Sequence, residues 1–576
     1  MTAEAFIQQK AAAAIQAIYG TEVAETSLQV SVTRKEFEGD YTLVTFPLLR
    51  ITHQAPDATG NAIGAWLLAN VPEIAAYNSV KGFLNLSFSP VYWSEALQAI
   101  AADEAFGQLP ATGRRIMVEF SSPNTNKPLH LGHIRNNLLG DSVSRILKAC
   151  GNEVIKSTIV NDRGVHICKS MYAWEQLFDG ATPESTGKKG DHLVGDCYVA
   201  YAKLEKEHPE VLDQVHQMLV KWEQGDPHVR ALWAMMNGWV YAGFDETYKA
   251  LGITFDQVDH ESETYLLGKE LVQKGLQEGV FVKDPDGSVW CDLTADGLDR
   301  KLVLRGDGTS VYITQDLGTA ERRFANYRLD SHVYVVGNEQ DYHFQVLKLI
   351  LKKLGFDWAD QIYHLSYGMV ELPEGKMKSR EGTVVDADDL IGSMYLEAKK
   401  TSEESGKLAD ISEEERDRLY HMIGLGALKY FIIKVDPKKT MLFNPKESID
   451  FNGNTGPFIQ YTHARICSIL RKATVAFGPA DVNAAVEPSA KEIRLTQLLS
   501  LYPAKVAEAG AALSPAVIAN YAYDLAKEFN QYYHETPILK EENGAVLKYR
   551  LELIAVLART LRSAMALLGI ELPERM

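Results

Sequence analysis

The residues with the clearest capacity for chemistry are His130 and His133, which flank Gly132 in the pattern H-x-G-H. Before them, residues 116–120 (IMVEF) have the composition of a short buried strand, and after them residues 134–149 carry apolar side chains at helical spacing. Where a strand leads into a helix, free backbone N–H groups and the positive end of the helix dipole favour an anion, and a glycine permits close approach. The pattern predicts a phosphate site, although a lone H-x-G-H is equally compatible with a simple capped turn.

A second segment, GKMKSREG at residues 375–382, carries several cations between two glycines. Such a loop can surround a polyphosphate and stabilise the charge that develops on a leaving pyrophosphate. Lys127, just upstream of the first histidine, is a further candidate cation. A basic loop alone is usually an ordinary surface feature, but its combination with H-x-G-H indicates nucleotide chemistry.

The elements that must position these motifs have the order of a β-α-β unit. A strand at 154–160 follows the helix that begins after the histidines, so the strands at 116–120 and 154–160 are expected to be parallel, with ligands at their carboxyl ends. A polar, Trp-rich helical stretch at about 180–265 reads as an insertion into this sheet domain. Further strands are predicted at 310–314, 332–336 and 362–366.

The regions on either side predict two more domains. Residues 1–110 combine amphipathic helices with alternating strands and predict a small α+β domain; residues 111–410 then form a Rossmann-like catalytic domain. Residues 411–576 are nearly all helical. The predicted fold class is therefore α/β plus all-α, with a parallel-sheet domain, its insertion and a C-terminal helical bundle. Helices are expected at 419–433, 458–472, 493–499, 516–533 and 548–568.

Charge and composition indicate which kinds of partner the chain can bind. The chain carries a net charge of −17, but residues 420–576 carry +3 and the remainder −20, which is compatible with local contact to a polyanion. No apolar run is long enough for a membrane span, and the start lacks the features of a signal peptide, so a cytoplasmic protein without membrane contact is expected. The five cysteines show no C-x-x-C pair, so no metal site is predicted.

A candidate substrate pocket lies between the two motifs. Glu119, Asn124, Tyr312, Asp316 and Gln340 are placed at or just beyond predicted strand ends. Two carboxylates, an aromatic wall and amide groups suit a planar cation, because a guanidinium fork matches a carboxylate in bidentate fashion.

The two motifs together resemble the HIGH and KMSKS signatures of class I aminoacyl-tRNA synthetases, and the chain closely resembles the arginyl-tRNA synthetase family. The N-terminal stretches 39–41 and 82–85 resemble that family's tRNA-contacting extra domain less specifically. The shared stretches are VEFSSPNTNKPLHxGH (118–133), NDRG (161–164), FD (255–256), ES (261–262), YxTxDL (312–317), QDxHF (340–344), YGMV (367–370) and YxHARICSILR (461–471).

This resemblance implies ATP-dependent ligation of L-arginine to tRNA(Arg) through an arginyl-adenylate, with Mg²⁺ on the ATP phosphates. It further implies a cytoplasmic monomer whose N-terminal domain touches the tRNA and whose helical domain reads the anticodon. The implied residue roles are catalysis by Lys127, His130, His133, Lys376 and Lys378; ATP binding by Gly132, His343, Met369, Val370, Met377 and Ser379; arginine binding by Glu119, Ser121, Asn124, Tyr312, Asp316 and Gln340; and tRNA binding by Arg465 and Arg471.

The chain departs from the family pattern in the basic loop, where Ser379 stands in place of the second lysine of KMSKS, with Lys378 before it and Arg380 after it. His166 stands where the family often has glutamine. Three alternatives remain open at this level. A class I synthetase for another amino acid would keep both loops without the acidic pocket. A nucleotidylyltransferase also uses H-x-G-H but has no need of a helical domain of this size. A tRNA-binding or regulatory homologue would keep the fold without activity.

Overall fold

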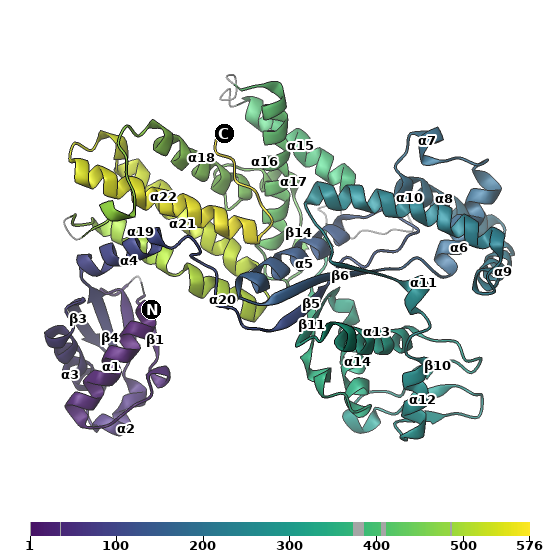
Figure 1. Cartoon of the computed structure of the whole chain (residues 1–576), viewed down its shortest axis with the longest axis horizontal. Helices are drawn as coiled ribbons and strands as arrows, with labels where there is room; N and C mark the ends of the chain where they lie inside the picture. Colours follow the sequence, from purple (N-terminus) through teal and green to yellow (C-terminus); the bar gives the residue numbers. More distant parts are fainter. Residues whose placement is uncertain (1, 35, 372–384, 405–410, 484–485) are drawn as a thin grey trace. The chain divides into compact units, whose positions relative to one another are not determined.

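The structure is a computed structural model that describes residues 2–34, 36–371, 385–404, 411–483 and 486–576 (Figure 1). The basic-loop residues Lys376, Met377, Lys378 and Ser379 lie outside these described residues. The chain divides into two compact units. The first comprises Met1–Phe106, Ile466–Pro503 and Leu525–Thr560, and the second comprises Gly107–Arg465, Ala504–Asp524 and Leu561–Met576.

The N-terminal part of the first unit is the α+β fold that the sequence predicts. An antiparallel sheet in the order β1-β2-β4-β3 packs against helices α1 and α3, which also contact each other (Figure 1). Its core contains the fully buried Leu43, Ile63 and Leu84. The elements are α1 (Ala3–Tyr19), β1 (Val30–Val32), β2 (Tyr41–Val44), α2 (Leu49–Thr52), α3 (Pro56–Asn70), β3 (Ile74–Val80), β4 (Phe83–Phe88) and α4 (Pro90–Ala102).

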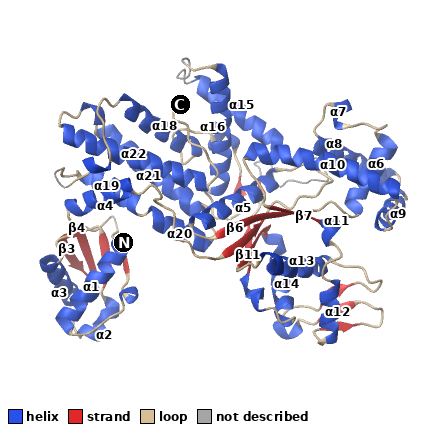
Figure 2. Ribbon diagram, in the orientation of Figure 1, coloured by secondary structure: helices blue, strands red, loops and turns tan. Residues whose placement is uncertain are grey.

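The second unit is built on a five-stranded sheet in the order β12-β11-β5-β6-β7, and every neighbouring pair is parallel (Figure 2). The predicted parallel sheet is therefore confirmed, and the carboxyl ends of its strands share one edge. Its strands are β5 (Arg115–Glu119), β6 (Glu153–Val160), β7 (Gln257–His260), β11 (Ser331–Gly337) and β12 (Ile362–Tyr367). The helices α5 (Leu131–Ala149), α13 (Tyr312–Tyr327) and α14 (Asp341–Lys353) accompany this sheet.

A helical insertion separates β6 from β7. The sequence predicts an insertion at about 180–265, but its end is wrong, because β7 lies within that range and pairs with β6 in the parallel sheet. The insertion consists of α7 (Pro183–Thr186), α8 (Gly190–Glu207), α9 (Val211–Glu223) and α10 (Pro227–Leu251), of which α8, α9 and α10 pack with α6 (Val165–Leu177). After β7 the chain adds a small antiparallel sheet in the order β10-β9-β8, which sequence patterns did not reveal because its strands are very short. This region contains α11 (Glu261–Thr264), α12 (Lys269–Gln277), β8 (Phe281–Lys283), β9 (Val289–Cys291) and β10 (Lys301–Leu304).

The strand predicted at 310–314 is wrong: helix α13 begins at Tyr312. The hydroxyl of Thr314 accepts a hydrogen bond from the backbone N–H of Val311, which fixes the start of the helix, and Ile313 and Leu317 are buried one turn apart. Tyr312 and Asp316 therefore stand on one face of a helix rather than at a strand end.

The C-terminal region is helical, as predicted. The sequence pattern missed α20, and β14 forms a short parallel pair with β13 (Val370–Glu371). None of the described helices is long and apolar enough to cross a membrane. The remaining elements are α15 (Ala387–Glu404), α16 (Glu413–Ile433), β14 (Met441–Leu442), α17 (Pro445–Ser448), α18 (Gly456–Lys472), α19 (Ala490–Ser500), α20 (Tyr502–Ala512), α21 (Ala516–Glu535) and α22 (Gly544–Leu567).

Candidate active site

The two histidines of H-x-G-H form the start of α5. His130 is the N-cap: its Nδ1 accepts a hydrogen bond from the backbone N–H of Gly132 at 3.1 Å, and its own N–H donates to Nδ1 of His133 at 3.2 Å. The two rings lie 4.0 Å apart between centroids. A side chain at Gly132 would place a Cβ 2.9 Å from Cε1 of His130, so the imidazole would have to shift to accept it.

The surroundings keep both imidazoles neutral. Burial, reinforced by the positive charge of Lys127, lowers the pKa of His130 to about 4, and burial holds the pKa of His133 well below its ordinary value. Burial also lowers the pKa of Lys127. Since each Nδ1 accepts a backbone hydrogen bond, the ring proton must reside on Nε2. Both histidines therefore offer an Nε2–H donor at the helix N-terminus, which suits a phosphate oxygen.

The turn after β5 is held in an unusual conformation. Ser121 and Ser122 have φ of 74° and 47°, in the left-handed region that non-glycine residues rarely occupy. The Ser121 Oγ lies 2.7 Å from Tyr248 Oη on α10, and the N–H of Ser121 donates to Oδ1 of Asn136 at 2.5 Å. These contacts hold a strained turn at the strand end, where such strain accompanies function.

Glu119, at the end of β5, does not offer a free carboxylate to the candidate substrate pocket. It is buried, and its Oε2 pairs with the guanidinium of Arg323, which is also fully buried. Arg323 binds Asp259 on β7 as well, with an Nη2–Oδ2 distance of 2.7 Å. The resemblance places Glu119 among the arginine-binding residues, whereas in the structure its carboxylate is engaged by Arg323.

The acidic group of the pocket is Glu261 together with Asp316. Burial, with the negative charges of Asp162 and Asp316 nearby, raises the pKa of Glu261 to about 7, against the opposing effect of Arg163. Within the described part of the chain Glu261 has no ion-pair partner, while Oδ2 of Asp316 lies 2.6 Å from Nε2 of His343. Tyr312, one turn before Asp316, has a 77% exposed side chain. Partial burial of its hydroxyl, together with the negative charge of Glu261, raises the pKa of Tyr312. A buried carboxylate without a cation is a site for one.

Glu261 was absent from the sequence-predicted pocket, although the stretch ES at 261–262 was noticed. The position of Glu261 is set by contacts of its neighbours with Asp162, which follows β6. Asp162 accepts hydrogen bonds from Tyr241 Oη at 2.7 Å and from the N–H of Ser262 at 2.8 Å, and it pairs with His260 at 3.3 Å. Burial opposes this charge, yet these hydrogen bonds hold the pKa of Asp162 below its ordinary value. The residues on both sides of Glu261 are therefore anchored to one carboxylate.

The other predicted pocket residues lie near the carboxyl edge of the sheet. Asn124 is exposed and forms a bridge with Asn161, just beyond β6, and Gln340 is exposed directly after β11. Met369 lies next to Gly337 at the end of β11, and its carbonyl accepts a hydrogen bond from the N–H of Met441. Val370 is buried. The exposed His166 contacts Tyr198 of the insertion at 3.0 Å between Nδ1 and Oη.

Basic side chains of the helical region divide into two groups. Arg550 and Arg559 are engaged internally: Arg550 pairs with Glu492, and Arg559 donates to the carbonyl of Ile100. Arg471 is exposed, and the guanidinium of the partly buried Arg465 lies 4.8 Å from the ring centroid of Tyr461.

Comparisons with known proteins agree along the whole chain. A model of the class I tRNA synthetase (R) catalytic domain matches residues 96–444, and a model of the DALR anticodon binding domain matches residues 459–576. Arginine--tRNA ligases of Bacteroides thetaiotaomicron and Bacteroides fragilis are 57% and 56% identical, each over 98% of both chains. The solved structure of Thermus thermophilus arginyl-tRNA synthetase aligns with a TM-score of 0.84 at 25% identity and covers 100% of both chains.

Proposed function

The chain belongs to the arginyl-tRNA synthetases, and we propose how its residues share the reaction of that family. The enzyme ligates L-arginine to tRNA(Arg) with ATP, through an arginyl-adenylate, and releases AMP and pyrophosphate. The carboxylate of arginine forms a bond to the α-phosphorus while the bond to pyrophosphate breaks; a terminal ribose hydroxyl of the tRNA then displaces AMP. No covalent enzyme intermediate is needed, so the protein acts by positioning and electrostatics.

Asp316 and Glu261 bind the guanidinium of the substrate. The observation that supports this role is the buried Glu261 carboxylate: it forms no ion pair with another described residue, and burial raises its pKa even though Arg163 opposes that shift. A guanidinium is always protonated, so it supplies a positive charge opposite this carboxylate together with a planar set of hydrogen-bond donors. The exposed ring of Tyr312 covers the guanidinium.

The remaining pocket residues bind the other end of arginine or support the wall. Asn124 and Gln340, both exposed at the carboxyl edge of the sheet, contact the substrate through their amide groups. Ser121 contributes the strained turn, and Glu119, which Arg323 holds in place, supports that turn by accepting a hydrogen bond from Ser122 Oγ.

The nucleotide occupies the start of α5. The Nε2–H groups of His130 and His133 donate to phosphate oxygens, Gly132 permits close approach, and Lys127 adds positive charge. His343 and the backbone at Met369 and Val370 contact the nucleoside.

Lys376, Met377, Lys378 and Ser379 complete the phosphate contacts, a role that rests on the sequence resemblance alone. The groups around His130 are imidazoles and a lysine rather than a set of carboxylates, and this donor set suits magnesium that is carried by the ATP phosphates. Bound there, Mg²⁺ would neutralise charge on the phosphates.

The tRNA contacts follow from the domain plan. We place the boundaries at 1–110, 111–410 and 411–576, with the N-terminal domain touching the tRNA and the helical domain reading the anticodon. The match of the anticodon binding domain to residues 459–576 supports the second assignment. Arg465 and Arg471 contribute to the contact with the tRNA phosphates.

We further propose that the enzyme is a cytoplasmic monomer and that arginine activation requires bound tRNA. No editing site is needed, because a guanidinium pocket rejects amino acids that lack its hydrogen bonds.

The test is ATP–pyrophosphate exchange with each amino acid, with and without tRNA, on the wild type and on Asp316→Asn. Loss of one charge-assisted contact is expected to raise the KM for arginine by about 10- to 100-fold, with the KM for ATP nearly unchanged. Glu321→Gln, further along α13, is the matched control. Exchange by Asp316→Asn with an unchanged KM for arginine would exclude Asp316 from the pocket.

A further inference from the structure

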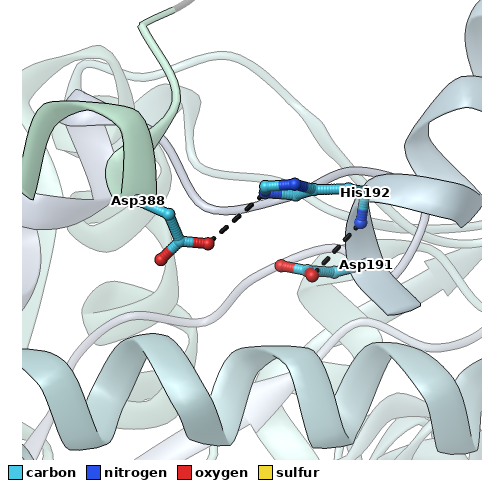
Figure 3. A group of neighbouring side chains, drawn as sticks. All are labelled: Asp191, His192 and Asp388. Carbon is cyan, nitrogen blue, oxygen red and sulfur yellow. Dashed lines mark hydrogen bonds and ion pairs between the residues drawn. The ribbon is translucent and has the colours of Figure 1, made fainter. Parts of the chain in front are cut away.

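A cluster of charged side chains connects the insertion to the first turn of α15. Lys189 precedes α8, Asp191 and His192 lie in the first turn of α8, and Asp388 lies in the first turn of α15. The Nζ of Lys189 lies 2.7 Å from Oδ2 of Asp388 and 3.3 Å from Oδ2 of Asp191. Figure 3 shows the imidazole of His192 directed at Asp388, with Nε2 and Oδ2 3.4 Å apart. Asp388 is thus held by two cationic residues of the insertion.

The carboxylates of this cluster already have cationic side chains as partners. The ligand atoms of Asp191, His192 and Asp388 lie within 4.8 Å of one another, a spacing that a metal ion would accept. However, the ammonium of Lys189 already contacts both carboxylates and also donates to Thr247 Oγ1 at 2.6 Å, and Asp191 has no exposed side-chain surface. These contacts make the group an internal ion-pair network, in which each carboxylate has a partner.

His192 carries a positive charge in this network. Its Nε2 lies 3.1 Å from Oδ2 of Asp386, and hydrogen bonding to Asp386 and Asp388 raises the pKa of His192 to about 10. Burial of Asp388 is outweighed by hydrogen bonds from His192 and Lys189, which hold its pKa below the ordinary value. Two positive residues of the insertion therefore fix two carboxylates of one short segment.

That same segment is bonded to the nucleotide-binding turn. The N–H of Ala387 donates to the carbonyl of Leu129 at 3.0 Å, and the N–H of Leu131 donates to the carbonyl of Val385 at 3.0 Å. Asp386 forms a backbone bridge with His130 between these two bonds. The side chains of residues 386 and 388 face the insertion, and the backbone of residues 385–387 borders His130 on both sides.

We propose that Lys189 and His192 are positioning residues for ATP: they act from the insertion, through Asp386 and Asp388, on the backbone that orients His130. The proposal rests on the role of His130 proposed above. Neither residue touches the substrate. Because a catalytic group that is misplaced by about 1 Å can lose about 100-fold in rate, a small displacement of this segment is sufficient for a large effect.

The experiment measures kcat and KM for ATP and for arginine separately, by pyrophosphate exchange with tRNA present. Lys189→Met and His192→Gln are expected to lower kcat/KM for ATP by roughly 10- to 100-fold, while the KM for arginine changes less than about threefold. The control is Lys188→Met, whose ion pair with Asp196 lies on the surface, and it is expected to match the wild type. His192 is one-third exposed, so its variant remains informative if Lys189→Met fails to fold.

A double-mutant cycle tests whether the effect passes through His130. If it does, adding Lys189→Met or His192→Gln to His130→Ala causes little further loss, because the group being positioned is already absent. Full additivity, equal losses for both substrates, or wild-type values in both single variants would overturn the proposal. An unchanged KM and kcat for ATP in His130→Ala alone would instead overturn the proposed role of His130, and that result is distinguishable from the others.

Discussion

Replacing Glu261 with glutamine removes one negative charge from the proposed guanidinium pocket while preserving the size of the side chain. Burial, reinforced by the negative charges of Asp162 and Asp316, raises the pKa of Glu261 to about 7, against the opposing effect of Arg163. A charge-assisted hydrogen bond contributes about 1.5–3 kcal/mol, so Glu261→Gln is expected to raise the KM for arginine by about 10- to 100-fold at pH 8.

The pH dependence gives a second, sharper expectation. The guanidinium needs the ionised form of Glu261, so with a pKa of about 7 the wild-type kcat/KM for arginine should fall about tenfold from pH 8 to pH 6. Glu261→Gln cannot titrate at this position. The ratio of wild-type to variant kcat/KM cancels every other titration in the assay and should therefore decrease about tenfold over the same interval.

The free energy of unfolding should change with pH in the opposite direction to kcat/KM: the contribution of Glu261 to stability should increase as the pH falls. A carboxyl whose pKa is raised in the folded state stabilises the fold below its unfolded value, and this stabilisation is lost as the pH rises through the folded value. For Glu261 that window runs from 4.5 to about 7. The ligand-free Glu261→Gln chain should gain on the order of 1–3 kcal/mol relative to the wild type at pH 8 and little at pH 4. Thermal melting at both pH values measures this difference.

The matched control is Glu263→Gln, an exposed position on the same helix. It should leave both the KM for arginine and the pH profile unchanged. The reasoning fails if Glu261→Gln has a wild-type KM for arginine, or if the ratio of wild type to variant does not vary between pH 6 and pH 8.

Three further outcomes are expected. His133→Ala should reduce pyrophosphate exchange about 100- to 1,000-fold by removing a donor to the phosphates. Gly132→Ala should lower kcat/KM for ATP, because the new Cβ would lie 2.9 Å from Cε1 of His130; an unaffected rate would show that the two rings are free to move apart. Arg323→Met should destabilise the chain by about 3–5 kcal/mol in denaturant unfolding, because it leaves the buried Glu119 unpaired, and adding Glu119→Gln should recover part of that loss.

Local patterns were sufficient for four strands of the parallel sheet, β5, β6, β11 and β12, but not for β7. The strand that ends at Glu119 was predicted from its continuous apolar run, and the helix that starts after His130 from apolar side chains at helical spacing. The same reasoning failed at 310–314, where a few apolar residues resemble a strand. There the Thr314 hydroxyl and the buried face of the following turns decide in favour of a helix.

By itself the sequence determined the family, the parallel sheet with its insertion, and the turn that we propose binds phosphate, because the motifs that indicate each are contiguous residues. The tertiary structure decided which charges remain available for a ligand. Glu119 and Arg323 meet across 204 residues, and Lys189 and Asp388 meet across 199. Glu261 is left without a cation among the described residues because its neighbours are engaged elsewhere. A charge is neutralised by whatever lies within a few ångströms, and only the folded chain brings such distant residues together.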